Sequence, residues 1–208
     1  MLVVYIVLDD AREALFAERP AAWAPAAYRA RLHAMRSREA RARTMAGLWL
    51  LEQGLGRLGH APDHLDGLGF AAGGRPRFAE GPGFSISHSG QLVACALDEA
   101  DVVGLDVEQR REGISPRLQQ WVAADGDFFD RWCAREATVK ASGHVGLARI
   151  RAVVVDDAIA RLDDRDWHLT WLSLVPGYAA CVAGPADSRP ATIETTDCSA
   201  LIKRVCAE

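Results

Sequence analysis

The sequence predicts an α+β fold made of two similar α/β halves, and three observations support this prediction. Segments with helical periodicity alternate with short β-type runs along the chain. The run LVACAL (92–97) is echoed by YAACVA (178–183). Each of these runs lies at a similar distance from the glycine that ends a preceding helical segment. We therefore expect halves at residues 1–100 and 101–208, related by pseudo-twofold symmetry, with a cleft between them.

The N-terminal half is expected to begin with a strand and to continue with helices. Residues 2–8 are an apolar run that is too short to span a membrane and follows no basic leader. A helical pattern then runs from Pro25 to Gly54, with a break near Ser37 because serine is a favoured helix N-cap. Gly54 or Gly56 is expected to end the second helix. Its apolar stripe contains Met45, Leu48, Trp49 and Leu55.

The rest of the chain reads as loop, strands, one strong helix and further strands. Glycine and proline make residues 56–83 an expected loop. Three strands follow: FSISH (84–88), LVACAL (92–97) and VVGLDVE (102–108). The last two are joined by the acidic turn DEAD (98–101). A helix is expected over 127–142, closed by Gly143. The final strand-like runs are IRAVVVDD (150–157), DWHLTWLSL (166–174) and GYAACVA (177–183), and no element is assigned to the polar tail after Pro185.

The composition is that of an ordinary soluble globular protein, with 50% hydrophobic and 25% charged residues. The net charge of -4 argues against a protein that coats nucleic acid or binds membranes through basic residues. Five cysteines are scattered without a C-x-x-C pair, and Cys95, Cys133 and Cys181 lie within apolar runs. This pattern predicts reduced, buried thiols in a cytoplasmic protein, with neither a disulfide framework nor a zinc site.

Two acidic residues share one face of the strand expected at 102–108. Side chains alternate along a strand, so Asp106 and Glu108 lie on one face while Leu105 and Val107 lie on the other. The two carboxylates would stand about 7 Å apart and would repel each other unless water or a cation lay between them. Such a D-x-E pattern is also typical of the solvated outer face of an amphipathic strand.

A third acidic residue interrupts the apolar stripe of the expected C-terminal helix. Phe129, Trp132 and Glu136 fall on one side at helical spacing, and Lys140 follows one turn later. Alone, Glu136 and Lys140 form an i, i+4 pair of the kind common on helix surfaces. Beside two aromatic residues, however, a carboxylate needs a cation. With the two acids of the strand it makes an all-oxygen set, which suits Mg²⁺ or Mn²⁺ holding a phosphate better than zinc.

A histidine ends the apolar face of the strand that precedes these acids. In FSISHSG (84–90), Phe84, Ile86 and His88 share one face because they alternate with serines. One explanation is a core histidine whose ring is bonded to a neighbouring carbonyl. The other is a side chain that donates a hydrogen bond to a phosphate oxygen.

Basic residues in two places fit the same anionic ligand. In the glycine-rich turn GGRPRF (73–78), Arg75 is fixed beside Pro76. Arg75 could there closely approach an anion or a flat base. A second stretch carries six arginines against one acid: Arg29, Arg31, Arg36, Arg38, Arg41 and Arg43. Most of these are expected on a solvated helix face, and one or two, with Arg43 among them, are expected to reach a phosphate.

Four motifs occur in the order and approximate spacing of a known family: GRP (74–76), FSISHSG (84–90), GLDVE (104–108) and WCAREATVKASG (132–143). Through them the sequence resembles the surfactin-type (Sfp-type) 4'-phosphopantetheinyl transferases, strongly over residues 74–143 and loosely elsewhere. The resemblance implies the two-halved fold of that family, a monomer, and coenzyme A as co-substrate in the cleft. It implies Mg²⁺-dependent transfer of the phosphopantetheine arm to a serine of an apo acyl or peptidyl carrier protein, with release of adenosine 3',5'-bisphosphate.

The same motifs imply a role for each site residue. Asp106, Glu108 and Glu136 resemble the Mg²⁺ ligands, with Mn²⁺ as the other candidate ion. Glu136 also resembles the general base for the carrier serine, acting directly or through a water. Lys140 resembles the lysine that contacts the pyrophosphate and assists the leaving group. The residues expected to bind coenzyme A are Gly74, Arg75, Pro76, Ser87, His88, Arg135 and Lys140, to which the arginine-rich stretch adds Arg43.

The chain departs from the family pattern in two ways. Arg75 and Arg135 stand where many members have lysine, which keeps the charge and changes the hydrogen-bond geometry. The segment 109–131 is shorter than in many members and lies where the family docks its carrier protein. An acidic carrier helix is expected to meet the arginines of this segment: Arg110, Arg111 and Arg117.

Two other functions fit part of the pattern. A metal-dependent nuclease or phosphodiesterase can also use acids of a strand together with a helical glutamate and lysine, although the acidic net charge argues against a nucleic-acid groove. A non-catalytic module that binds carrier proteins is the second alternative.

Overall fold

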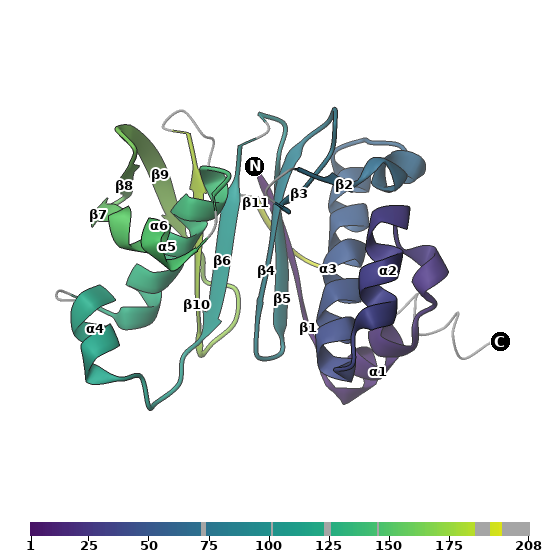
Figure 1. Ribbon diagram of the computed structural model, residues 1–208, viewed down its shortest axis with the longest axis horizontal. Coiled ribbons are helices and arrows are strands. Elements are labelled where there is room, and N and C mark those ends of the chain that lie inside the picture. Colours follow the sequence, from purple (N-terminus) through teal and green to yellow (C-terminus); the bar gives the residue numbers. More distant parts are fainter. Residues whose placement is uncertain (72–73, 101, 123–125, 145, 186–191, 197–208) are drawn as a thin grey trace.

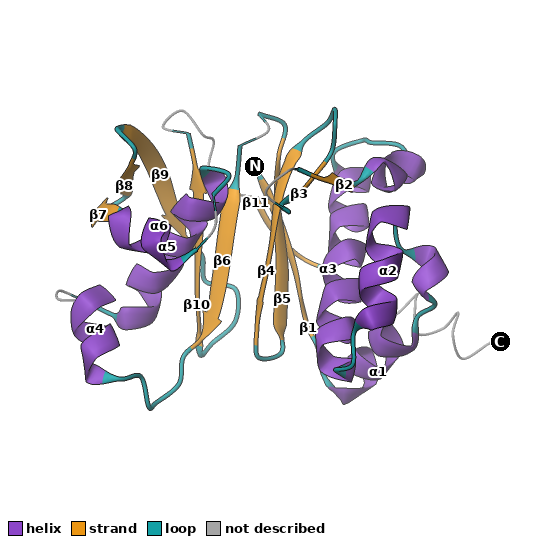
Figure 2. Ribbon diagram, in the orientation of Figure 1, coloured by secondary structure: helices purple, strands orange, loops and turns teal. Residues whose placement is uncertain are grey.

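The computed structural model describes residues 1–71, 74–100, 102–122, 126–144, 146–185 and 192–196, and it is a mixed helix-and-sheet fold, as predicted. Two sheets stand next to each other in the middle of the molecule, and helices cover their outer faces (Figures 1 and 2). The strand order is β11-β1-β5-β4 in the first sheet and β6-β10-β9-β8-β7 in the second. Among the described helices, none is both long and apolar enough to cross a membrane.

Two helices of the N-terminal half begin where the sequence predicts, although the second of them ends later, and the helix that directly follows the first strand was not predicted. The first elements are β1 (Leu2–Val7), α1 (Asp10–Glu18), α2 (Ala26–Ala34) and α3 (Arg38–Arg57). The Ser37 hydroxyl accepts a hydrogen bond from the Ala40 backbone N–H at 3.1 Å, so the predicted break is confirmed. Helix α3 continues through both glycines that were expected to end it. A Cβ on Gly54 would lie 2.4 Å from a Leu97 methyl group, so this glycine lets the helix approach β5.

The segment predicted as a loop contains short elements, and the strands after it divide between the two sheets. The structure places there a 3-10 helix (Pro62–Gly67), β2 (Gly69–Phe70) and β3 (Pro76–Arg77). Next come β4 (Gly83–Ser89), β5 (Leu92–Asp98) and β6 (Gly104–Gln109). β4 and β5 form an antiparallel hairpin. β5 and β6 do not pair, because the chain crosses from the first sheet to the second between them.

The C-terminal half is built on one well-defined helix. Its elements are α4 (Pro116–Val122), α5 (Phe128–Ala141), α6 (Leu147–Ala152), β7 (Val154–Asp156), β8 (Ile159–Leu162), β9 (Arg165–Trp171) and β10 (Tyr178–Gly184). Asp127 caps α5 by accepting from two backbone N–H groups, and Gly143 follows its end, as predicted. The run 150–157 was predicted as a strand throughout; its first residues belong instead to α6. Strand β8 was not predicted.

A strand from the C-terminal region completes the first sheet. β11 (Thr192–Thr195) pairs with β1 in parallel, and the Thr196 N–H bonds to the Tyr5 carbonyl. The first sheet therefore contains residues from both ends of the described chain, while the boundaries of the two halves stay a prediction. The remainder of the tail, with Cys198 and Cys206, lies outside the described residues.

Three apolar clusters hold these layers together. One lies between the first sheet and α1–α3, and a second between the other sheet and the helices α5 and α6. The third lies between the two sheets, where side chains of β1 and β5 meet those of β6 and β10. Cys95, Cys133 and Cys181 are free and buried, as predicted, and burial raises the pKa of each thiol.

A glycine allows β6 to lie directly on α5. A Cβ on Gly104 would stand 2.0 Å from the Ala137 carbonyl oxygen and 2.4 Å from the Ala141 nitrogen. Both atoms belong to the helix backbone and have no rotamer by which to move aside. The contact brings the acidic residues of β6 next to those of α5.

Candidate active site

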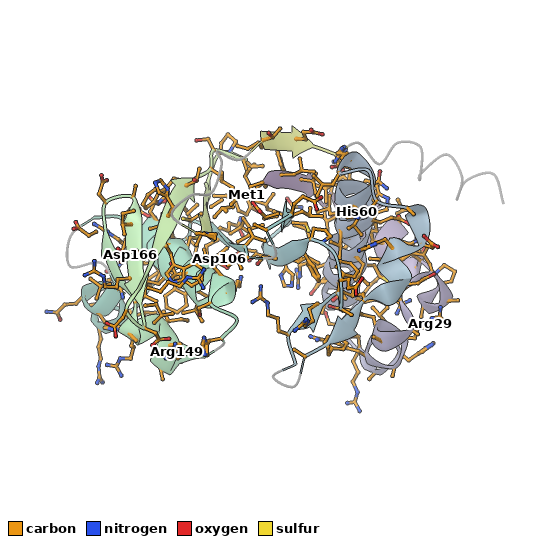
Figure 3. All side chains as sticks on the ribbon, turned by 90° about the horizontal axis from the view of Figure 1, so that it is seen from above. Met1, Arg29, His60, Asp106, Arg149 and Asp166 are labelled. Carbon is orange, nitrogen blue, oxygen red and sulfur yellow. The ribbon has the colours of Figure 1, made fainter. Side chains whose placement is uncertain are left out.

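Asp106 lies on β6, on the side of the second sheet nearest the first (Figure 3). Its side chain is only 4% exposed. Oδ1 accepts hydrogen bonds from Lys140 Nζ at 2.6 Å and from the Ser87 hydroxyl at 2.9 Å. Oδ2 is buried and has no hydrogen-bond partner in the part of the chain that the structure describes. One oxygen of this carboxylate is therefore fixed, and the other is buried in a side chain that lies close enough to the Cys133 thiol to raise the pKa of that thiol.

Lys140 connects the acids of the strand and the helix. Besides Asp106, its ammonium group donates to the Leu105 carbonyl at 3.0 Å and to the Ser87 hydroxyl at 3.1 Å. It lies 3.8 Å from Glu136 Oε2 on the same helix. Lys140 thus stands between the two carboxylates and supplies the positive charge nearest to both.

Among the three acids of the site, Glu136 is the one whose pKa is clearly shifted. Its pKa is raised from 4.5 to about 7, first by burial and then by the negative charge of Asp106, with Glu108 adding to the effect. Lys140 acts in the opposite direction and does not cancel these two causes. Lys140 thus joins this helical acid to Asp106, while the three acids as one set of ion ligands stay a prediction.

Glu108 lies near the C-terminal end of β6 and is held there by hydrogen bonds. Its Oε2 accepts from the Ser89 hydroxyl at 2.8 Å and from Arg111 Nη1 at 3.3 Å. In the described ranges no three His, Cys, Asp or Glu side chains are already gathered as a set of metal ligands.

The donor set nevertheless fits a hard cation. The orphaned Asp106 oxygen and the mutual repulsion of the acids indicate negative charge that the protein alone leaves uncompensated. Carboxylate oxygens suit Mg²⁺ or Mn²⁺ better than zinc. Asp106, Glu108 and Glu136 are the side chains that would hold such an ion.

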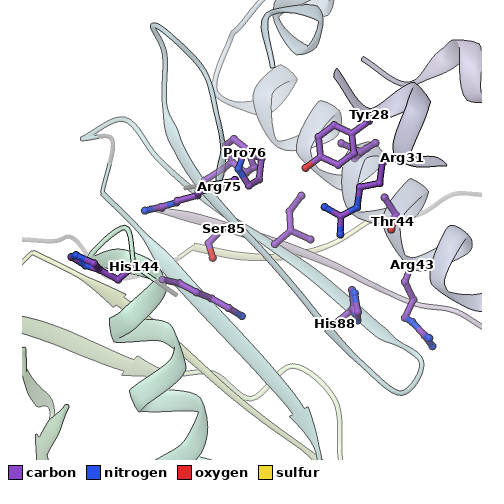
Figure 4. Close-up of a pocket in the computed structure, with 14 residues that line it drawn as sticks. Tyr28, Arg31, Arg43, Thr44, Arg75, Pro76, Ser85, His88 and His144 are labelled. Carbon is purple, nitrogen blue, oxygen red and sulfur yellow. The ribbon is translucent and has the colours of Figure 1, made fainter. Parts of the chain in front are cut away.

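A cationic cavity adjoins this cluster. It has a volume of about 310 Å³, and both halves of the molecule contribute to it (Figure 4). Of the residues predicted to bind coenzyme A, those that line it are Arg43, Gly74, Arg75, Pro76, His88 and Lys140. The described residues that line it include no carboxylate. The cavity therefore suits a phosphorylated ligand, and Lys140 links it to Asp106.

Arg31, one of the six arginines noted in the sequence, also lines the cavity, and three further lining residues were not singled out: Tyr28, Thr44 and His144. Tyr28 and Arg31 lie one turn apart on α2, and Figure 4 shows both beside Pro76 and Thr44. Burial raises the pKa of Tyr28 to about 12. The helical i, i+3 spacing of Tyr28 and Arg31 was the signal available in the sequence.

His88 faces the cavity at its solvent-exposed rim. Its ring is open to solvent, yet enough protein surrounds it for desolvation to lower its pKa, and the positive charge of Arg43 lowers it further. Lys140 also lowers this pKa, while Asp106 and a backbone hydrogen bond raise it. The imidazole is therefore poised to gain a proton when an anion arrives.

Two residues predicted to bind coenzyme A are engaged elsewhere. Arg135 donates to the carbonyls of Ile150 and Val153 next to α6, and it does not line the cavity. Burial lowers the pKa of Arg135. Ser87 is also absent from the lining, and its hydroxyl is bonded to Asp106. The predicted contacts of both residues with coenzyme A stay predictions.

Comparison with known proteins gives two relatives, whereas no family model matches the chain. A "putative 4'-phosphopantetheinyl transferase" of Haemophilus influenzae is 37% identical over 98 residues, which cover 38% of this chain and 42% of the relative. The 4'-phosphopantetheinyl transferase psf-1 of Bacillus pumilus is 28% identical over 145 residues, which cover 59% and 61%. Both relatives are named 4'-phosphopantetheinyl transferases. The matches span less than two thirds of either relative and support a phosphopantetheinyl transferase in general terms.

The arginines predicted to meet a carrier protein differ in their surroundings. Arg110 forms ion pairs with Asp127 at 2.5 Å and Asp130 at 2.6 Å, in the first turn of α5. Arg111 is bonded to Glu108. Arg117 lines a groove of about 280 Å³ between α4 and α6, together with Ser115, Leu118, Trp121, Leu147 and Arg151.

Proposed function

We propose that the protein is a surfactin-type transferase that moves the 4'-phosphopantetheine arm of coenzyme A to a serine of an apo acyl or peptidyl carrier protein. The observation that carries this proposal is the cationic cavity that ends at Lys140, which is bonded to Asp106 and lies beside Glu136. The matched relatives, both named 4'-phosphopantetheinyl transferases, support it. In the reaction the serine oxygen bonds to the phosphorus that carries the pantetheine arm. The bond from that phosphorus to the bridging oxygen breaks, and adenosine 3',5'-bisphosphate leaves with the oxygen.

The residues of the cavity would bind and orient coenzyme A. Arg43 and His88 would hold its phosphates, with His88 at the 3'-phosphate, and Gly74, Arg75 and Pro76 would form the side next to the adenine. Lys140 would donate to the pyrophosphate and stabilise charge on the leaving oxygen. Phosphoryl transfer requires mainly such positioning and charge neutralisation.

Glu136 would take the proton of the carrier serine, directly or through a water. A carboxylate can serve as such a base when it lies within hydrogen-bond reach of the serine hydroxyl. Asp106, Glu108 and Glu136 would hold Mg²⁺, with Mn²⁺ as the other candidate. When bound, the ion would neutralise charge on the pyrophosphate oxygens.

The groove between α4 and α6 gives the carrier protein a place to dock. Leu147 is 63% exposed there, and the Arg151 guanidinium lies 5.1 Å from the centre of the Trp121 ring. An acidic helix with an apolar face would meet both kinds of side chain. Arg117 and Arg151 replace Arg110 as the expected contacts, because Arg110 already serves two acids of the protein. A cytoplasmic monomer with pseudo-twofold halves completes the proposal.

The test is the intact mass of an apo carrier protein after incubation with the protein, coenzyme A and Mg²⁺. We expect a gain of one phosphopantetheine and no gain when EDTA is present. Coenzyme A binding without any mass gain on carriers from fatty-acid, polyketide and peptide synthesis would favour the non-catalytic binding module. Cleavage of plain nucleotide diesters, DNA or RNA with Mg²⁺ would instead favour the phosphodiesterase.

Binding of coenzyme A is expected to take up a proton at neutral pH. The pKa of His88 lies below its ordinary value in the free protein, so its imidazole is mostly neutral, and a bound phosphate would favour the charged form. Affinity should therefore rise as the pH falls from about 8 to about 6.5. Calorimetric titration in buffers of different ionisation enthalpy measures the uptake. His88→Gln should abolish it and dephospho-coenzyme A should reduce it; uptake unchanged in the variant would contradict the assignment of His88.

A further inference from the structure

The second sheet has a free edge that faces the first sheet. β6 is its outermost strand and, among the described strands, pairs only with β10, so alternate backbone groups of β6 lack a strand partner there. In Figure 1, β4 of the first sheet runs beside this edge. Buried backbone groups of an unpaired edge need hydrogen bonds from elsewhere.

Serine hydroxyls of β4 take the place of the missing strand. Ser85 accepts from the Leu105 N–H at 2.9 Å, Ser87 from the Val107 N–H at 3.3 Å, and Ser89 from the Gln109 N–H at 3.0 Å. We call these three residues the serine ladder. Their spacing of two residues matches the spacing of the β6 amides, because both strands have a period of two.

Each of the three hydroxyls donates its own hydrogen bond to a different acceptor. Ser85 donates to the Leu105 carbonyl at 3.5 Å, which is backbone. Ser87 donates to Asp106 Oδ1 at 2.9 Å, and Ser89 donates to Glu108 Oε2 at 2.8 Å. Two members of the ladder therefore bond to carboxylates, and the third bonds to the main chain alone.

We propose that Ser87 and Ser89 are positioning residues, which fix the carboxylates of Asp106 and Glu108 from the opposite sheet. Each hydroxyl donates to one carboxylate and accepts from the backbone N–H of the residue that follows that acid on β6. The hydroxyl therefore fixes the orientation of the carboxylate group relative to the strand. The packing of the two sheets thereby sets the separation of the two acids. The inference deepens the proposed function and rests on it, because these acids are the proposed ion ligands.

Ser89 gives the clearest test, because within the described part of the chain its hydroxyl bonds only to Glu108 and the Gln109 N–H, whereas Ser87 also receives a bond from Lys140. Ser85→Ala is the matched control: it removes a hydroxyl from the same strand and face and leaves the acids untouched. Partners that orient metal ligands typically change metal affinity by about 10-fold or more when removed. We therefore expect Ser89→Ala to weaken Mn²⁺ binding about 10-fold, and Ser89→Thr to restore it, because threonine keeps the hydroxyl and suits a strand.

The experiment is a titration of the full chain with Mn²⁺ followed by electron paramagnetic resonance, with Tm measured for each variant. Both alanine variants leave one N–H without a partner, so each should lower Tm by about 2–4 °C. Ser85→Ala should keep the Mn²⁺ affinity of the parent protein. Equal affinity in Ser89→Ala and Ser85→Ala, or no recovery in Ser89→Thr, would overturn the positioning role. Absence of Mn²⁺ binding by the parent protein itself would overturn the proposed ion site, and this inference with it.

Discussion

Glu136→Gln is expected to lower the rate of phosphopantetheine transfer by about 10²–10⁴-fold, the range typical of a lost general base. The variant keeps the shape of the side chain and removes the basic oxygen to which the proposed mechanism gives the proton of the carrier serine. Coenzyme A should still bind in the absence of added metal ion, because Glu136 does not line the cationic cavity. The measurement is the single-turnover rate of carrier modification by intact mass, with coenzyme A affinity determined separately.

The control for this variant is Glu39→Gln on α3. Glu39 is exposed in the first turn of that helix, and the substitution makes the same change in net charge. Its transfer rate should stay close to that of the parent. A parent-like rate in Glu136→Gln, with Tm within about 2 °C of the parent, would remove Glu136 from the role of base.

Gly104→Ala is expected to destabilise the fold by about 3 kcal/mol or more, at the upper end of the range for overpacked positions. The added methyl group would stand 2.0 Å from a backbone oxygen of α5, so the helix or the strand must move. That movement separates Asp106 from Lys140 and should also weaken coenzyme A binding. Urea unfolding gives the loss of stability as a lower midpoint.

Gly56→Ala is the control for Gly104→Ala, because it adds the same methyl group at a position with free space. It lies in the last turn of α3, and a Cβ there would meet nothing within 4 Å among the described residues. Alanine in a helix is more stable than glycine by about 0.5–1 kcal/mol, so this variant should be slightly stabilised. Equal stability of the two variants would show that β6 does not need the close approach to α5.

Local patterns were sufficient to predict the parts of the site that one element determines. Asp127 and Gly143 mark the ends of α5 through an N-cap and a C-terminal glycine, both of which act within a few residues. The alternation in β6 places Asp106 and Glu108 on one face for the same reason. The motif order then predicted Glu136 and Lys140 beside these acids, and the structure shows Lys140 paired with Asp106 and next to Glu136.

Features that depend on distant parts of the chain could not be predicted in this way. The acidic turn after β5 is typical of a hairpin, and only the packing of two sheets shows that the next strand belongs to the other one. Arg135 carries the expected charge, but its contacts depend on α6. This helix was not predicted, because the β-branched run 153–155 made the whole segment 150–157 look like a strand. The serines of β4 are visible in the sequence as an alternation, whereas their partners on β6 are not.

The pairing of β11 with β1 has a consequence for how the protein is made. About 190 residues separate Leu2 from its partner Thr192. At about 5–20 residues per second, a ribosome needs roughly 10–40 s to synthesise that interval. Throughout it, the nascent first sheet exposes the edge of β1, the kind of edge on which another chain can pair. β11, the last of the described strands, covers that edge, so the edge of β1 stays open until residues 192–195 have been synthesised.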